Sequence, residues 1–154
     1  MDTFSRFWRQ PNKAYRDFQF VYTALALNFL FPSLVYALNP VGAIRRFERI
    51  GILLGGGEYG LVAGEAGYVW RLLAAGNVLS LAFMCALLQF DLKHFYSVLA
   101  PLVFMKSLAA LGFLAVYLLA YRYPAFLVVF LYDGLTVFLM LYFAIRARRS
   151  LAPG

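Results

Sequence analysis

The stretch that decides the fold is Val98–Ile145, VLAPLVFMKSLAALGFLAVYLLAYRYPAFLVVFLYDGLTVFLMLYFAI, two long apolar runs joined by the polar turn Tyr121–Pro124. Each run is long enough to cross a bilayer, which takes about 20 apolar residues at a helical rise of about 1.5 Å. Lys106 lies within the first run and Asp133 within the second. Because an ionisable side chain at membrane depth is costly unless it is paired or hydrated, these two residues define the principal candidate site.

The composition of the whole chain is that of a membrane protein. Of its 154 residues, 64% are hydrophobic and 14% are charged, whereas soluble domains are typically about 45–50% apolar and about 25% charged. The excess of apolar side chains must face lipid. The net charge of +7 is explained by basic flanks of membrane helices rather than by a nucleic-acid site, so we expect no nucleic-acid partner.

The apolar runs predict an all-α, integral membrane bundle of four transmembrane helices. We expect one membrane domain over residues 19–147, followed by a C-terminal tail at 148–154. The four spans are predicted at residues 19–38, 69–90, 98–121 and 125–145.

Residues 1–18 precede the first span and combine cations with aromatic side chains such as Phe7 and Trp8. This pattern indicates an amphipathic segment on the membrane surface, with its aromatic face inward and its cations in water. A signal-peptide n-region and a solvated basic flank are the alternatives.

Residues 41–68 form the least regular part of the predicted domain. Arg45 and Arg46 share one helical face and Phe47 lies on the other, which predicts an interfacial helix after the first span. The glycine-rich run within 50–64 disfavours helix, since each glycine costs about 1 kcal/mol relative to alanine. We therefore expect a loop that lies against the bundle or partly re-enters it, before Trp70 and Arg71 open the next span at an interface.

Lys106 and Asp133 lie on consecutive antiparallel spans, with an axial offset of roughly 8–9 Å at about 1.5 Å per residue. A lysine side chain covers much of that offset, so a direct or water-bridged pair is expected. Asn28 and Asn77 lie at comparable depths on the other spans, and we predict that all four residues, with Arg71 nearby, face a common interior. Such a cluster fixes helix register, carries protons or ions, or binds a polar ligand.

Four spans place both ends of the chain on one side of the membrane. Eight Lys and Arg residues fall outside the spans on that side and five on the other. The positive-inside rule then predicts cytoplasmic termini, and we expect a bacterial inner membrane.

The sequence offers no self-sufficient catalytic or metal site. His94 is the only histidine and Cys85 the only cysteine, so neither a bis-histidine haem site nor a disulfide forms within the chain. Haem shared with another subunit is left open. We expect no cofactor encoded by the chain alone, and nothing in the sequence requires an enzyme.

Trp70-Arg71, Lys106 and Tyr132-Asp133-Gly134 form a layout that resembles the small bacterial four-helix membrane proteins described as DoxX-like. In that family a glycine often precedes the lysine and the aspartate, whereas Met105 and Tyr132 stand there in this chain. The resemblance implies a four-helix bundle and, in some relatives, association with membrane redox enzymes.

These features favour an accessory or structural transmembrane subunit of a larger membrane complex, in contact with lipids and other transmembrane subunits. The alternative is a homo-oligomeric small transporter, or a module that binds a lipid or quinone at the Lys106–Asp133 site. A membrane enzyme acting on a lipid or quinone is the third hypothesis.

Overall fold

The computed structural model describes residues 12–58 and 65–151, without the side chains of residues 65–70. Every element in these ranges is helical: α2 (Lys13–Leu38), α3 (Pro40–Leu53), α4 (Glu65–Phe90), α5 (Leu92–Phe95), the 3₁₀ turn η1 (Tyr96–Val98), α6 (Leu99–Leu119) and α7 (Pro124–Ser150). Four helices are long and apolar enough to cross a membrane, which confirms the predicted helical class and the number of candidate spans.

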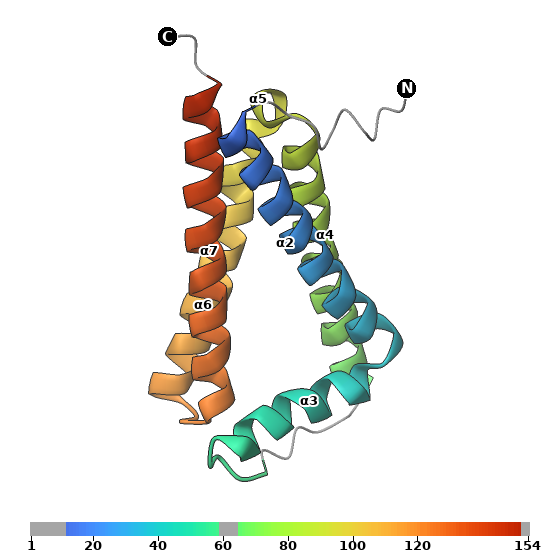
Figure 1. Cartoon of the computed structure of the whole chain (residues 1–154). Coiled ribbons are helices and arrows are strands. Elements are labelled where there is room, and N and C mark those ends of the chain that lie inside the picture. The colour runs from blue at the N-terminus through green and yellow to red at the C-terminus, as the bar shows by residue number, and fades with distance from the viewer. Residues whose placement is uncertain (1–11, 59–64, 152–154) are drawn as a thin grey trace.

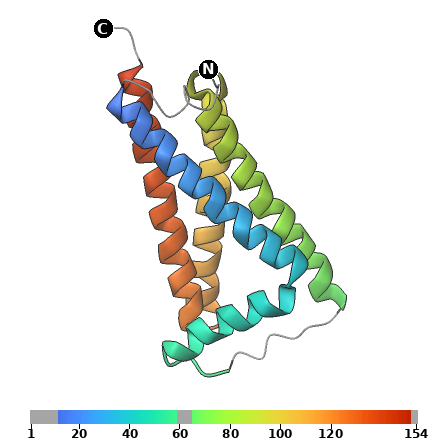
Figure 2. The same cartoon turned by 45° about the vertical axis from the view of Figure 1, so that its right-hand side comes forward.

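The four long helices form two pairs that diverge. α2 packs along α4, and α6 packs along α7. The pairs meet near α5 and spread apart toward the opposite end, where α3 runs across the opening (Figures 1 and 2). We call the α5 side the closed end and the α3 side the open end.

The closed end holds the main core, in which side chains from both pairs are buried. Phe18 and Tyr22 of α2 meet Leu88 of α4, Leu102 of α6 and Met140 of α7 with no exposed surface. The Tyr22 hydroxyl donates a 2.9 Å hydrogen bond to the Met140 carbonyl. A buried phenol requires such a partner, because an unsatisfied polar group in an apolar core is costly.

α3 begins and ends at residues whose chemistry fixes those points. The Asn39 side chain accepts a 3.0 Å hydrogen bond from the Gly42 amide, and Pro40 occupies the first turn, where no amide is needed. After Leu53 the chain passes through Gly55 and Gly57, which have positive φ angles of 83° and 69°. Only glycine adopts these angles without strain, so the helix ends here.

Several helices begin or end at residues other than those predicted. α2 begins at Lys13 because Asn12 caps it, so residues 13–18 belong to the first span and Phe18 is buried rather than lying on a membrane surface. α4 begins at Glu65 and α7 continues through Arg148 to Ser150, within the predicted tail. Trp8, with the rest of 1–11, and residues 59–64 lie outside the described residues, so the surface segment and the re-entry of 50–64 stay predictions.

Candidate functional site

A cavity of about 480 Å³ lies between the diverging helix pairs. It exists because the closed end brings the pairs together while the open end holds them apart. All four long helices and α3 contribute to its wall. Its polar lining residues are Asn28, Tyr36, Asn77, Lys106, Tyr132 and Asp133.

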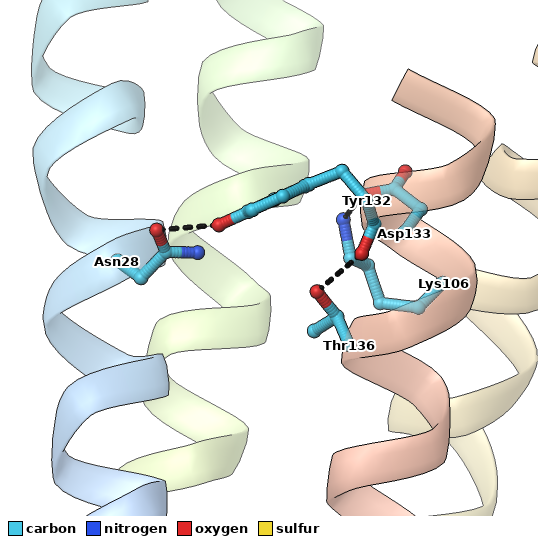
Figure 3. Close-up of polar contacts among 5 residues, drawn as sticks. All are labelled: Asn28, Lys106, Tyr132, Asp133 and Thr136. Atoms are coloured by element: carbon cyan, nitrogen blue, oxygen red, sulfur yellow. Dashed lines mark hydrogen bonds and ion pairs between the residues drawn. The ribbon is translucent and has the colours of Figure 1, made fainter. Parts of the chain in front are cut away.

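Lys106 and Asp133 form a direct ion pair at the deep part of this cavity (Figure 3). The two side chains are only 10% and 6% exposed. The Lys106 ammonium also lies 5.0 Å from the centre of the Phe29 ring, within the range of a cation–π interaction. The pair is therefore stabilised from α2 as well as from the α6–α7 hairpin, and its two charges cancel.

A second polar contact crosses the cavity from one helix pair to the other. The Tyr132 hydroxyl on α7 donates a 2.6 Å hydrogen bond to the side-chain oxygen of Asn28 on α2, and Figure 3 shows the ring reaching across the gap. Tyr132 is 48% exposed, so this bridge lies in an open part of the cavity. The bridge connects the two pairs where their backbones have already separated.

Asn77 lines the same cavity from α4. Its side chain is exposed, and among the described residues it makes no hydrogen bond within the protein. An amide facing a cavity in this way supplies both a donor and an acceptor to a bound molecule. The structure thus places the predicted quartet, Asn28, Asn77, Lys106 and Asp133, around one cavity.

Arg71 lies in an adjacent chamber rather than beside the ion pair. This chamber has a volume of about 290 Å³ and lies between α3 and the ends of the long helices. The two chambers share Tyr36, Phe47, Ala74 and Phe113 as walls, so they adjoin. Of the residues predicted at an interface, Arg45 and Arg46 are exposed on α3, whereas the Trp70 side chain and all of Trp8 lie outside the described part.

Tyr123 fixes α3 across the open end. Its hydroxyl donates hydrogen bonds to the Glu48 carbonyl at 2.9 Å and to the Gly57 carbonyl at 3.3 Å. Burial, and to a lesser degree the nearby Glu48 carboxylate, raise the pKa of the Tyr123 hydroxyl above its ordinary value, so it stays a donor. Its ring also lies 6.0 Å from that of Phe47 on α3.

The sequence did not indicate the roles of Tyr132 and Tyr123. Tyr132 is one of several aromatic side chains of α7, and two others, Phe138 and Tyr142, are 62% and 48% exposed. Its position at the depth of Asn28 is the signal that could have indicated the bridge. Tyr123 lies in the turn between α6 and α7, far from Glu48 along the sequence, and no pattern in the sequence indicates that the two residues are in contact.

No group of three or more metal-binding side chains occurs in the part of the chain that the structure describes. His94 is exposed next to the Asp91 cap of α5, and Cys85 is buried in the core. What the cavity offers chemically is therefore hydrogen bonding and a neutral ion pair within aromatic walls.

Comparison with family models, with curated proteins and with solved structures gives no match for this chain. The resemblance to DoxX-like proteins stays a prediction.

Proposed function

We propose that the protein binds one amphiphilic molecule, of the lipid or quinone type, inside the membrane between its two helix pairs. The observation that supports this function is a cavity with mostly apolar walls and one polar cluster, the Lys106–Asp133 pair with Asn28 and Asn77. Ligand sites typically combine such apolar walls with a few polar groups that fix orientation. An intramembrane ion pair is costly to keep, which also favours a functional role.

The volume of the cavity limits what it binds. At about 30 Å³ per water-sized group, the volume of about 480 Å³ holds about 16 non-hydrogen atoms. This suits a ring with a short chain, or part of one long chain, and is too small to enclose a whole two-chain phospholipid. Because the charges of Lys106 and Asp133 cancel, a neutral polar group fits the deep end better than a multiply charged one.

Filling the cavity tests this proposal. Ala109 of α6 lines the cavity, and Ala109→Phe places a ring there while Lys106 and Asp133 themselves are unchanged. Ala100→Phe is the matched control, since Ala100 lies on the same helix and is exposed. We expect mass spectrometry of the gently extracted protein to show a bound amphiphile in the wild type and in Ala100→Phe, and its loss in Ala109→Phe. An unchanged set of bound molecules in Ala109→Phe would contradict the proposal.

A second candidate function is that of an accessory subunit in a larger membrane complex, in which redox enzymes are one expected class of partner. A separate apolar groove of about 690 Å³ between α2 and α4 favours it. Gly76 lies in this groove, and a Cβ atom built on it would meet no atom within 4 Å. Small residues on such a face allow another transmembrane helix to approach closely.

Native mass spectrometry of the protein extracted from its own membrane tests the second candidate. Foreign subunits in a fixed ratio would support it, and Gly76→Leu should then release them. A monomer or homo-oligomer that carries only small molecules would contradict it and leave the ligand-binding function.

We further propose that the open end faces away from the cytoplasm of a bacterial cell. The start of α2 and the end of α7 lie together, since Asn12 donates a 3.0 Å hydrogen bond to the Ser150 carbonyl. This end carries the larger number of Lys and Arg residues, which favours a cytoplasmic location. Labelling of a cysteine introduced at Ser150 by a membrane-impermeant reagent in intact cells would contradict this orientation.

A further inference from the structure

α3 presents a basic surface on the side of the helix that faces away from the cavity. Arg45, Arg46 and Arg49 are exposed. Phe47 lines the cavity, and Gly51 lies against Tyr123. At 3.6 residues per turn, the three arginines cluster on one side of the helix and these two residues on the other. The helix is therefore amphipathic, with its apolar side used by the bundle and its basic side free.

The position of α3 places this surface at the level of the lipid headgroups. α3 runs across the ends of the membrane-spanning helices rather than along them (Figures 1 and 2), and Tyr123 holds it there. Arg122, in the turn that Tyr123 closes, is also exposed. Four exposed arginines thus gather at the open end.

The other charges near this surface leave it positive. Among the described side chains of α3 and the loop after it, Glu48 and Glu58 are acidic. Two carboxylates do not neutralise four guanidinium groups, so anions are attracted to this end of the molecule.

We propose that this surface, made of Arg45, Arg46, Arg49 and Arg122, binds the phosphate groups of anionic phospholipids. A guanidinium group recognises phosphate through two parallel hydrogen bonds, and a basic amphipathic helix at the interface is attracted to anionic lipid.

The apolar neighbours of the arginines favour lipid over an acidic protein. Ile52 and Leu53 continue the exposed surface of α3 and are 46% and 84% exposed. Leu53 at that exposure is stabilised by contact with hydrocarbon, while the arginines one to two turns earlier are stabilised by phosphate or water. A membrane interface supplies both within a few ångströms. This inference is independent of the ligand proposed for the cavity.

Photo-crosslinking in nanodiscs tests the proposal on the full chain. The discs consist of phosphatidylcholine with a small amount of photoreactive phosphatidylglycerol, or of photoreactive phosphatidylcholine for comparison. We expect peptides of α3 to be labelled by the anionic probe at least about tenfold more than by the zwitterionic probe, given the attraction of each arginine to an anionic surface. The variant R45Q/R46Q/R49Q should lose most of this preference.

Two further variants make the result specific. R45K/R46K/R49K keeps the charge and should keep most of the preference, which separates charge from helix folding. K13Q/K93Q/R149Q removes three exposed cations from the closed end and should leave the labelling of α3 unchanged.

Three outcomes would overturn the proposal. These are equal labelling of α3 by both probes, a preference that survives R45Q/R46Q/R49Q, and an equal loss in the closed-end variant. Equal labelling by both probes would leave an acidic protein as the alternative partner of this surface.

Discussion

The two ends of this bundle use polar contacts in different ways. At the closed end, the polar contact between the helix pairs is a tyrosine hydroxyl held within fully buried apolar packing. At the open end, the polar contact between the pairs is an exposed bridge from Tyr132 to Asn28, and an ion pair within the α6–α7 pair faces the cavity. The same four helices thus combine a dry core and a polar chamber.

This difference suggests that the two ends of the helices have separate roles. The closed end supplies the packing that keeps the pairs together, which allows the open end to leave space unfilled. Cavities cost stability in proportion to the contacts that are lost. A bundle that keeps an open chamber therefore needs a well-packed region elsewhere, and the core around Tyr22 and Leu102 fills that role.

The largest loss of stability is expected from breaking the Lys106–Asp133 pair. Lys106→Met or Asp133→Leu leaves one buried charge without its partner, and each should lower the free energy of unfolding by about 3–5 kcal/mol. The double variant removes both charges and should recover most of that loss. Unfolding titrations in mixed micelles would give the three values.

The double variant also tests whether the ion pair contributes to ligand binding as well as to stability. If it folds like the wild type but no longer retains the amphiphile, the pair contributes to ligand binding. Single variants that unfold like the wild type would show that the pair is well hydrated, and the expected cost would then be wrong.

A smaller effect is expected at the contact between α3 and Tyr123. A Cβ atom at Gly51 would overlap the Tyr123 ring, so Gly51→Ala must displace either the ring or the helix. Overpacking of this kind typically costs about 1–3 kcal/mol. Hydrogen exchange should become faster in α3 while the closed end is unchanged.

Gly76→Ala is the control, because its added methyl group meets no atom within 4 Å. It should leave the exchange of α3 as in the wild type. Equal exchange of α3 in wild type and Gly51→Ala would show that Tyr123 adjusts without releasing the helix.

The contrast between the ends also explains which features the sequence predicts. Lys106 and Asp133 stand out because ionisable residues are rare in apolar runs, and the short hairpin limits their separation. Asn28 and Asn77 follow from their depth. The divergence of the helix pairs was not predictable, since it results from packing between residues distant in sequence, such as Tyr123 and Glu48. The start of α2 was predicted too late because Lys13 and Arg16 made this segment resemble a charged flank. Tyr15 and Phe18, which are three residues apart and both buried, show that it belongs to the helix.

Removing one tyrosine hydroxyl at each end gives a direct comparison of the two regions. Tyr22→Phe deletes the donor to the buried Met140 carbonyl, and Tyr132→Phe deletes the donor to Asn28. Hydrogen bonds between membrane helices contribute about 0.6 kcal/mol on average and about 1.7 kcal/mol at most. Tyr22→Phe should fall in the upper part of that range and Tyr132→Phe near zero, because its partner is accessible to other polar groups. The opposite order in unfolding titrations would show that the open end contributes more to stability than its exposure indicates.

The smallest effect should come from the ion pair at the rim of the closed end. Arg146 and Asp17 are separated by 3.4 Å between nitrogen and oxygen, with side chains 43% and 31% exposed. Pairs of this exposure contribute at most about 1 kcal/mol and often much less. Asp17→Asn should therefore change the free energy of unfolding by about 0.5 kcal/mol or less, and added salt should reduce the difference further.

Asp91→Asn is the matched control for that measurement. It removes one negative charge from the same end but keeps the cap of α5, since asparagine caps helices as well as aspartate does. The excess destabilisation of Asp17→Asn over Asp91→Asn is the contribution of the ion pair itself. An excess well above 1 kcal/mol would show that the closed end depends on its rim charges as well as on its buried core, and the contrast between the two ends would then be one of degree.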